Sequence, residues 1–500
     1  MELLSNLALG LSVAVDPSNL LYCFIGALLG TLVGILPGVG PTATIAMLLP
    51  ITFTLNPETA IIMLAGIYYG AQYGGSTTAI LLNLPGESSS AVTAIDGYQM
   101  ARKGRAGVAL SIAAIGSFFA GTITTFVIAA FAAPLTLLAL QFSPHEYFSL
   151  ILFGLIASIA LAHGSFIKAL AMIVLGLLLG LVGTDLYTGA QRFTFRIPEL
   201  SDGIDFVAAA VGLFGVAEIV RNLEGNVDRK GTVNRITTLL PTRQDLARAG
   251  LPIIRGTGLG SVLGILPGGG ALLASFASYA LEKKLSRHPE EFGHGAIEGV
   301  AGPESANNSG AQSSFIPMLT LGIPSNAVMA LIVGAMIIQG IVPGPTVMTT
   351  QPNLFWGIIA SMWIGNLMLL ILNLPLVGIW VQLLRVPYSV LFPAIIVFSA
   401  IGVYSVASNS FAVYTITAFG FIGYVLAKLD CEPAPLLLGF ILGPMLEEHL
   451  RRAMIVGRGD ATVFFTRPIS AGLLLLSLLL LVAIFLPFVQ KKREDVFVED

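Results

Sequence analysis

Long apolar segments separated by short polar stretches fill almost the whole chain of 500 residues. Most of them approach the length of about 20 apolar residues that a helix needs to cross a bilayer. Gly and Pro shorten or interrupt several of them. The segments are 19–36, 58–82, 107–135, 146–163, 166–183, 204–220, 256–280, 310–338, 353–380, 388–405, 411–428, 434–446 and 470–489. This pattern predicts an all-α polytopic membrane protein with about 12 transmembrane helices.

The only long polar stretch covers residues 221–255 and contains seven Lys or Arg residues. Basic residues collect in cytoplasmic loops of membrane proteins, so this stretch is predicted to be a cytoplasmic connecting loop. It separates a first membrane half, residues 1–220, from a second half, residues 256–500, that carries extra C-terminal spans. Lys491–Arg493 follow the last apolar segment and are predicted to anchor it on the cytoplasmic side.

Composition supports the membrane assignment. Only 11% of the residues are charged, whereas a soluble chain carries about 25%. The net charge of −3 does not suggest a nucleic-acid partner, and the two cysteines and five histidines have no metal-site spacing. Neither GxSxG nor the phosphate-binding GxxxxGK[ST] occurs, so hydrolysis of esters or of ATP is not indicated. We therefore expect no enzymatic activity and no cofactor.

An internal repeat relates the two halves. Residues 30, 34–38 and 40 are identical to residues 260, 264–268 and 270, and both copies contain Leu-Pro-Gly-X-Gly. Some forty residues later each half has a polar run that is followed by a proline. These runs are Ala71–Thr78 before Asn83-Leu84-Pro85, and Asn307–Ser314 before Gly322-Ile323-Pro324. Two matches in the same order indicate duplication.

The loops of the two copies differ in charge. Arg102, Lys103 and Arg105 follow the first polar run, whereas residues 340–352 after the second have no basic residue. The reverse holds after the Gly-rich motifs, where residues 53–58 lack basic residues and 283–287 contain three. Equivalent loops are thus expected on opposite sides of the membrane. This predicts two inverted-topology repeats with broken or re-entrant helices, an arrangement typical of secondary transporters.

Proline and glycine together interrupt a helix, and backbone exposed at membrane depth must line a protein cavity or a water path. A helix that begins after such a break presents N–H groups and partial positive charge, which suit carboxylates. Simple kinks are the alternative, and Gly26, Gly30 and Gly34 are better explained by close helix packing. The predicted solute-binding residues here are Gly38, Gly40, Thr42, Gly268, Gly269 and Gly270.

The two polar runs supply hydroxyl and amide groups for a solute and a coupling cation. Hydrogen bonding between helices is the alternative role. The predicted solute-binding residues of the runs are Ser76, Thr77, Thr78, Asn83, Asn307, Asn308, Ser309 and Ser313, with a cation site near Ser76, Asn308 and Ser314. The candidate proton carriers are Glu87, Asp96, Glu298 and Glu304.

The chain resembles the large membrane subunit of the tripartite tricarboxylate transporters (TctA-like) from about residue 18 to 488. The stretches that carry the resemblance are Gly34–Pro41, Tyr73–Gly86, Asp96–Tyr98 and Gly302–Asn308. The resemblance implies a multi-pass protein of the bacterial inner membrane that works with a small membrane subunit of about four spans. It also implies a periplasmic solute-binding protein, a carboxylate such as citrate as solute, and an ion gradient (Na⁺ or H⁺) as the driving force.

Two other classes of function are alternatives to a transporter. An intramembrane enzyme needs a nucleophile–base pair or paired carboxylates at membrane depth, and His163 is the one histidine near a span interior. A channel or purely structural subunit can also contain inverted repeats. Saturable flux that depends on an ion gradient separates a transporter from a channel.

Overall fold

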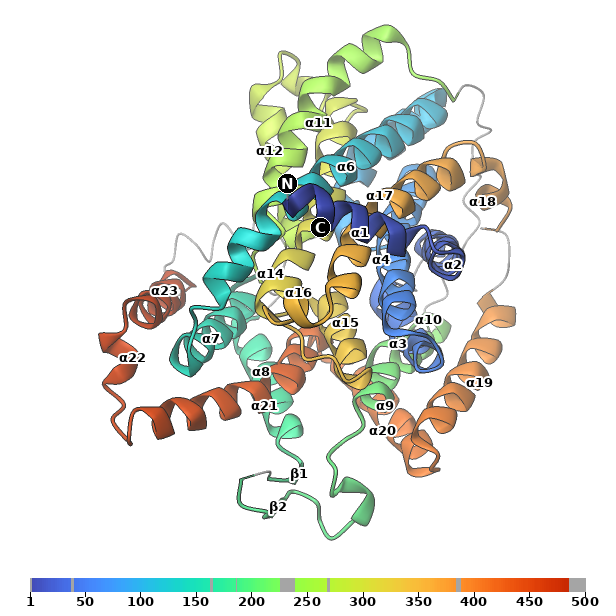
Figure 1. Ribbon diagram of the computed structural model, residues 1–500. Helices are drawn as coiled ribbons and strands as arrows, with labels where there is room; N and C mark the ends of the chain where they lie inside the picture. The colour runs from blue at the N-terminus through green and yellow to red at the C-terminus, as the bar shows by residue number, and fades with distance from the viewer. Residues whose placement is uncertain are drawn as a thin grey trace.

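The computed structural model describes residues 2–36, 40–161, 165–185, 187–224, 239–267, 270–383 and 388–484. These residues form an all-α protein with one short β-hairpin, which confirms the all-α part of the predicted fold class (Figure 1). The inverted-topology repeats stay a prediction. The centre of the predicted connecting loop, His163 and the basic residues 491–493 lie outside the described residues.

The first half of the chain runs from the N-terminus to Glu224. Its elements are α1 (Glu2–Ala14), α2 (Pro17–Ile35), α3 (Pro41–Thr52), α4 (Pro57–Leu82), η1 (Ser88–Ser90), α5 (Ala91–Met100), η2 (Ala101–Arg105), α6 (Ala106–Ala139), α7 (Pro144–Leu161), α8 (Phe166–Gly180), β1 (Gly183–Thr184), β2 (Gln191–Arg192), η3 (Pro198–Leu200), α9 (Phe206–Ala210), η4 (Val211–Val216) and α10 (Ala217–Glu224). The strands β1 and β2 pair antiparallel, with Gly183 opposite Arg192.

The second half begins with a capping box. Thr242 accepts a hydrogen bond from the Asp245 N–H while the Asp245 carboxylate accepts one from the Thr242 N–H. The elements are α11 (Arg243–Leu263), α12 (Gly270–Leu285), η5 (Pro289–Glu291), α13 (Glu298–Ser313), α14 (Phe315–Leu321), α15 (Ala327–Ile338), α16 (Val347–Thr350), α17 (Pro352–Asn373), α18 (Val377–Leu383), α19 (Tyr388–Ala407), α20 (Phe411–Lys428), α21 (Pro433–Val456), α22 (Val463–Thr466) and α23 (Pro468–Ile484).

Four stretches of described helix are long and apolar enough to cross a membrane: Pro17–Ile35, Ser88–Ala139, Pro352–Asn373 and Phe411–Lys428. Several shorter apolar helices accompany them, among them Pro41–Thr52 and Ala327–Ile338. Short helices are expected where proline and glycine interrupt a span. The chain is therefore a membrane protein, whereas the number of about 12 transmembrane helices stays a prediction.

The two Gly-rich motifs end helices at equivalent places. Helix α2 ends at Ile35 and α3 begins at Pro41, while α11 ends at Leu263 and α12 begins at Gly270. Pro41 occupies the first turn of α3, where its missing N–H costs nothing. Both predicted interruptions are thus present in the structure.

Glycines on α2 and α11 allow each helix to touch the backbone of a partner. A Cβ atom at Gly26, Gly30 or Gly34 would overlap the carbonyl of Met63, Ile67 or Ala71 on α4; one at Gly256, Gly260 or Gly264 would overlap Gly302, Ala306 or Gly310 on α13. This confirms close packing for Gly26, Gly30 and Gly34. The two helix pairs, α2 with α4 and α11 with α13, are therefore built alike.

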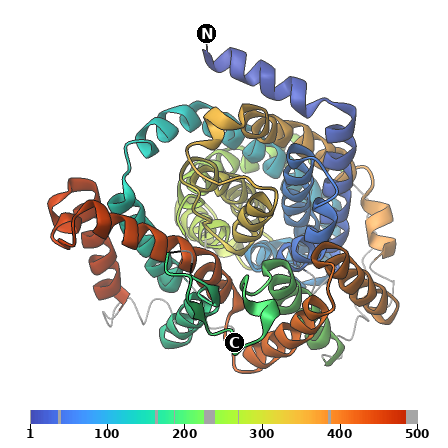
Figure 2. The same cartoon turned by 60° about the horizontal axis from the view of Figure 1, so that its bottom comes forward.

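Helices α4 and α13 form the centre of the molecule. Every residue from Thr59 to Leu81 of α4 and from Gly299 to Ser313 of α13 is buried. Seen from the lower end (Figure 2), α14 and α15 lie near the axis of the molecule, and α15 contacts α3, α4 and α21. A buried core of apolar side chains surrounds them, with Phe315, Phe355 and Trp356 among its largest members.

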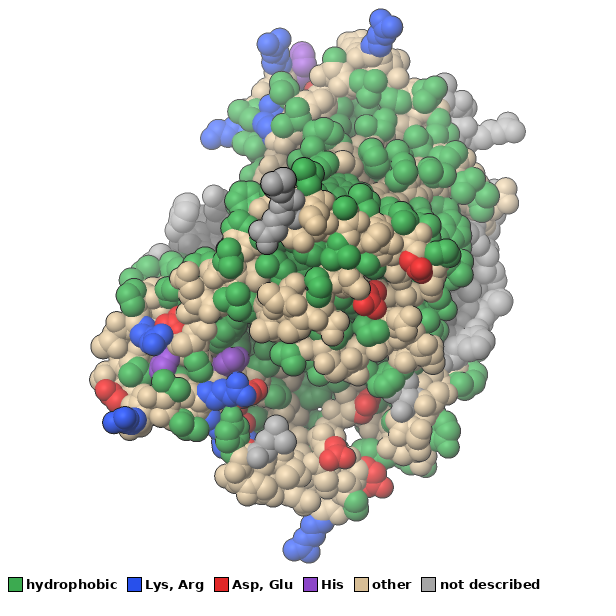
Figure 3. Space-filling model, viewed as in Figure 1, with side chains coloured by type: hydrophobic (Ala, Val, Ile, Leu, Met, Phe, Trp, Pro, Cys, Tyr) green, Lys and Arg blue, Asp and Glu red, His purple; other side chains and the backbone are tan. Residues whose placement is uncertain are grey.

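Hydrophobic side chains are spread over the upper and middle parts of the visible surface, and few charged side chains lie among them, as suits a lipid-facing surface (Figure 3). Basic side chains cluster over the end formed by α11 and α12. At this end Lys103 donates a hydrogen bond to the carbonyl of His294 (2.6 Å), and Arg105 pairs with Asp245. The hairpin β1–β2 lies at the opposite end (Figure 1).

Candidate functional site

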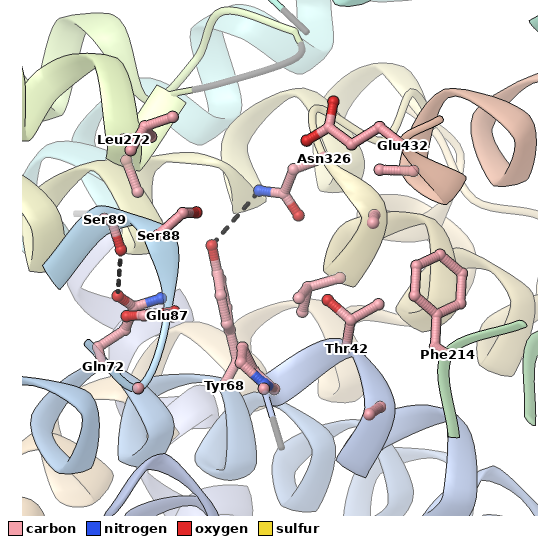
Figure 4. Close-up of a pocket in the computed structure, with 18 of the residues that line it drawn as sticks. Thr42, Tyr68, Gln72, Glu87, Ser88, Ser89, Phe214, Leu272, Asn326 and Glu432 are labelled. Carbon is pink, nitrogen blue, oxygen red and sulfur yellow. Dashed lines mark hydrogen bonds between the residues drawn. The ribbon is translucent and has the colours of Figure 1, made fainter. Parts of the chain in front are cut away.

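A cavity of about 560 Å³ lies where the two halves of the chain meet. Its wall includes the start of α3 (Gly40–Ala43) and the start of α12 (Gly270–Leu272). It also includes the start of α15 with its N-cap residue Asn326, and the segment Pro85–Ser89 before α5. Figure 4 shows Thr42, Glu87, Leu272 and Asn326 around the same open space. The volume falls within the range of about 300–1,000 Å³ that is usual for small-molecule sites.

Four helices begin at this cavity: α3, α12, α15 and α21, the last contributing Ala434 and Pro435. The first N–H groups of a helix have no partner within the helix, and they carry partial positive charge. In α15 the Asn326 side chain accepts the Met329 N–H at 2.9 Å. In α3 no side chain caps the first turn. Convergent helix starts favour an anion in the cavity.

The cavity is lined by equivalent segments of the two halves. Gly40–Thr42 corresponds to Gly270–Leu272 in the Gly-rich repeat. After the long helices, Asn83 and Gly322 both have a left-handed backbone, with φ of 58° and 73°. Glu87 follows Asn83 at the same distance along the chain as Asn326 follows Gly322. Glu87 and Asn326 are therefore equivalent positions of the two repeats, and both line the cavity. The site therefore lies at the junction between the repeats.

Polar side chains complete the wall. The amide of Asn326 donates to the Tyr68 hydroxyl at 3.4 Å, and the Ser89 hydroxyl donates to the Gln72 side chain at 3.4 Å (Figure 4). Arg221 of α10 also lines the cavity and is largely exposed, with a 3.9 Å pair to Glu218. Three carboxylates, those of Glu87, Glu218 and Glu432, share this wall with the guanidinium, so the preference for anions rests on the helix starts and not on side-chain charge.

The structure brings together only part of the predicted solute-binding set. Gly40, Thr42 and Gly270 line the cavity. Gly38, Gly268 and Gly269 lie outside the described residues. Thr44, one turn into α3, is buried, and its hydroxyl donates to the carbonyl of Gly40 at 3.1 Å.

Both polar runs lie in continuous helix, the second as far as Ser313. Ser76, Thr77 and Thr78 lie within α4; Asn307, Asn308, Ser309 and Ser313 lie within α13; Asn83 is the exposed C-cap of α4; and Ser314 joins α13 to α14. Within these helices some hydroxyls bond the preceding turn, as Ser76 does to the carbonyl of Gln72 (2.9 Å). None of these residues lines the large cavity.

These side chains mostly join helices. Asn308 donates to the Ser117 hydroxyl of α6 at 2.6 Å, Ser309 donates to the carbonyl of Thr257 at 2.8 Å, and Ser313 to that of Gly260 at 3.1 Å. Ser314 bonds its own turn through the carbonyl of Ala311. A much smaller cavity, of about 10 Å³, lies beside Ser76, Thr77, Ser117 and Glu304. Hydrogen bonds between helices thus account for most of the polar side chains in both runs.

The four carboxylates singled out in the sequence occupy different environments. Glu298 pairs with Arg248 at 2.8 Å. Asp96 accepts three backbone N–H groups, from Gly293, Gly295 and Ala296. Glu87 faces the large cavity, and Glu304 is fully buried between α13, α4 and α5.

Sequence reasoning missed Asn326, Arg221 and the start of α21 as parts of the wall. Asn326 has a signal in the repeat, because it stands two residues after Pro324 as Glu87 stands two residues after Pro85. Arg221 and Ala434 come from helices outside the repeated motifs. No local pattern indicates that they reach the cavity.

The fold and the cavity define a polytopic helical membrane protein whose internal site suits an anion. Residues 20–438 match the family described as "Tripartite tricarboxylate transporter TctA family", and the chain belongs to this family. It is accordingly a subunit of a tricarboxylate transporter of the tripartite kind, which works with other subunits. The family is one of transporters and not of enzymes.

Two relatives come from Agrobacterium vitis. The chain is 66% identical over the full length of both chains to the "Uncharacterized 52.8 kDa protein in TAR-I ttuC' 3'region". It is 68% identical over 241 residues, 48% of this chain and all of the relative, to the "Uncharacterized protein in TAR-II ttuC' 3'region". No solved structure matches the chain.

Proposed function

We propose that the chain is the large transmembrane subunit of a binding-protein-dependent secondary transporter in the bacterial inner membrane. It imports tricarboxylates such as citrate, or related carboxylates, by symport with Na⁺ or H⁺. The observation that carries this proposal is the cavity of about 560 Å³ into which α3, α12, α15 and α21 direct their first turns. A solute with several carboxylates can bind at several helix starts at once.

The two halves act as inverted repeats that alternate access to the cavity. Two matching contacts support this arrangement. Lys103, after the polar run of the first half, bonds the loop after α12 through the carbonyl of His294. Gln339, after α15 of the second half, bonds the end of α3 through the carbonyl of Thr52 (2.6 Å) and the following loop through the carbonyl of Leu55 (3.4 Å). Such reciprocal contacts between non-equivalent loops are expected if one half is turned over relative to the other.

The transporter works with a small membrane subunit of about four spans and with a periplasmic protein that captures the solute. A channel would use the same cavity without coupling, and it would not saturate. No observation favours this alternative, because the wall combines an anion-suited surface with helices that are packed at their centres.

Uptake of radiolabelled citrate tests the proposal. Vesicles would contain this chain, its small subunit and its binding protein, with Na⁺ and proton gradients imposed separately. We expect saturable uptake that requires the binding protein and one of the two gradients. Uptake of succinate or malate in place of citrate would change the substrate and leave the mechanism as proposed. Flux of every acid that is independent of both gradients would exclude secondary transport.

A further inference from the structure

Asn307 has a buried side-chain oxygen without a hydrogen-bond partner. The helix that carries it, α13, is buried on every side although it is rich in Ser, Asn and Gln. Neighbours on other helices satisfy most of these groups; Gln312, for example, accepts the Thr125 hydroxyl at 2.9 Å. The Oδ1 of Asn307, in contrast, is buried and has no hydrogen-bond partner among the described residues. A buried unpaired amide oxygen is costly and calls for a ligand.

Glu304 lies one turn before Asn307 and is fully buried. Its carboxylate accepts hydrogen bonds from the hydroxyls of Ser76 and Thr93, the second at 3.1 Å, and from the Asn307 amide at 3.5 Å. No basic side chain pairs with it among the residues that the structure describes. Burial of an unpaired charge is unfavourable, so this carboxylate favours a bound cation.

Glu87 approaches the same place from the cavity. Its side chain packs over Gly75, the neighbour of Ser76, and interacts with Asn307, Gln72 and Ser89. Its Oε1 is buried and has no hydrogen-bond partner. Asn307 thus lies between a carboxylate on the cavity wall and a carboxylate behind it. The two unpaired oxygens belong to adjacent side chains and call for one shared partner.

We propose that Glu87, Asn307 and Glu304 form the binding site of one monovalent coupling cation, a proton or Na⁺. A proton on Glu87 makes its carboxyl a donor to the Asn307 Oδ1. A sodium ion would be bound by the oxygens of all three side chains, which are the ligands that hard cations prefer. Either cation satisfies both unpaired oxygens and neutralises one carboxylate.

This site also provides a reason for coupling, and it rests on the proposed function. Glu87 lines the cavity that is proposed to hold the anionic solute. An ionised Glu87 repels solute carboxylates through a poorly solvated space, and a bound cation removes that repulsion. Cation binding and solute binding then favour each other by the same factor.

Other titratable groups near the site come from each neighbouring element. Tyr68 and Tyr73 face it from α4, while Glu218, Arg221 and Glu432 lie on the wall of the large cavity. Asp96 of α5 is held by backbone N–H groups one turn beyond Thr93. On the α12 side Glu282 pairs with Arg255. Among the residues that the structure describes, Glu87 and Glu304 alone contact Asn307 and have a carboxylate without a basic partner.

The test compares exchange with accumulation in vesicles that contain the whole complex. The probe is whichever of citrate, succinate and malate the wild type exchanges. Glu87→Gln and Glu304→Gln remove the charge and keep the shape. We expect both variants to lose gradient-driven accumulation, so that the accumulation ratio falls to about 1. Glu304→Gln, which lies outside the solute cavity, should retain solute exchange. Glu58→Gln, which changes a carboxylate in the first turn of α4, should accumulate solute like the wild type.

Accumulation by both Gln variants at the wild-type level would overturn the site. If the wild type exchanges none of the three acids, the proposed transport function is wrong, and the proposed cation site is wrong with it. A second test measures the solute affinity of the purified wild-type complex and needs no variant. The affinity should rise at lower pH if the cation is a proton, and with added Na⁺ at fixed pH if the cation is sodium. An affinity that responds to neither cation would also overturn the proposal.

Discussion

Glu87 and Asn326 face one cavity from equivalent positions of the two repeats, and they differ in chemistry. Each stands two residues after a proline and at the start of a helix. The Asn326 side chain caps α15 by accepting the Met329 N–H, whereas Glu87 leaves its Oε1 unpaired. The same position thus stabilises the second repeat and supplies a free carboxylate oxygen in the first. The duplicated sequence places the two residues at equivalent positions, and the difference between a carboxylate and an amide makes the site asymmetric.

Replacing the cap residue of α15 is expected to destabilise the protein. Asn326→Ala removes the 2.9 Å bond from Met329 and the contact with Tyr68. Loss of such a cap costs about 1 kcal/mol. Thermal unfolding of the purified protein in detergent measures the change. Asn56→Ala is the control, because Asn56 is the N-cap of α4 without a side-chain cap bond. Equal losses in the two variants would contradict the role of Asn326.

Two glycines on α11 are predicted to respond to alanine with opposite signs. A Cβ atom at Gly260 would overlap the carbonyl of Ala306, whereas one at Gly258 meets no atom within 4 Å. Gly260→Ala should therefore lower stability by about 1–3 kcal/mol through overpacking. Gly258→Ala should raise it by up to about 1 kcal/mol, because alanine favours the helix. The unfolding temperatures of both variants test this prediction. A Gly260→Ala protein as stable as the wild type would argue against tight contact of α11 with α13.

The sequence predicts more of the fold than of the site. The Leu-Pro-Gly-X-Gly repeat correctly indicates where α2 and α11 end, since proline and glycine act locally. The polar run Asn307–Ser314 was open to two interpretations, because a serine that binds a solute and one that bonds a neighbouring helix look alike in sequence. Only the packing of α13 against α6 and α11 distinguishes them. Arg221 reaches the cavity through the tertiary fold alone.

The hydroxyl of Thr42 is expected to contribute to solute affinity. Thr42 lines the cavity at the uncapped start of α3. Thr42→Val keeps the shape and removes a donor, and a hydrogen bond to a charged group is worth about 1.5–3 kcal/mol. The KM for uptake should therefore rise about 10-fold or more. Thr44→Val is the matched control, because the Thr44 hydroxyl bonds its own helix and is buried away from the cavity. Similar KM values for the two variants would remove Thr42 from the site.

The hairpin segment between α8 and α9 is predicted to loosen in acid. It lies outside the membrane-spanning helices. Asp185 pairs with Arg451 of α21 (3.3 Å) and with Arg192 of the hairpin (2.7 Å), which in turn pairs with Glu447 of α21 (2.9 Å). Hydrogen bonds from the Thr188 hydroxyl, from the Tyr187 N–H and from Arg192 lower the pKa of Asp185 from 3.8 to about 2. Because the pKa is lower in the folded state, the stabilisation is present above the usual value and is lost as the pH falls towards 2.

Pepsin, which is active in acid, can follow this loosening at Phe193 and Phe195, both exposed in the hairpin segment. Cleavage there should increase between pH 4 and pH 2 in the wild type, and Asp185→Asn should be cleaved readily at pH 4 already. Asp202→Asn removes a carboxylate of the same segment and leaves the Asp185 pairs in place, so it should behave like the wild type. If Asp185→Asn resists pepsin at pH 4 as the wild type does, the ion pairs of Asp185 do not hold the hairpin. In that case the docking of the segment depends on its other contacts, among them the pair of Arg192 with Glu447 of α21.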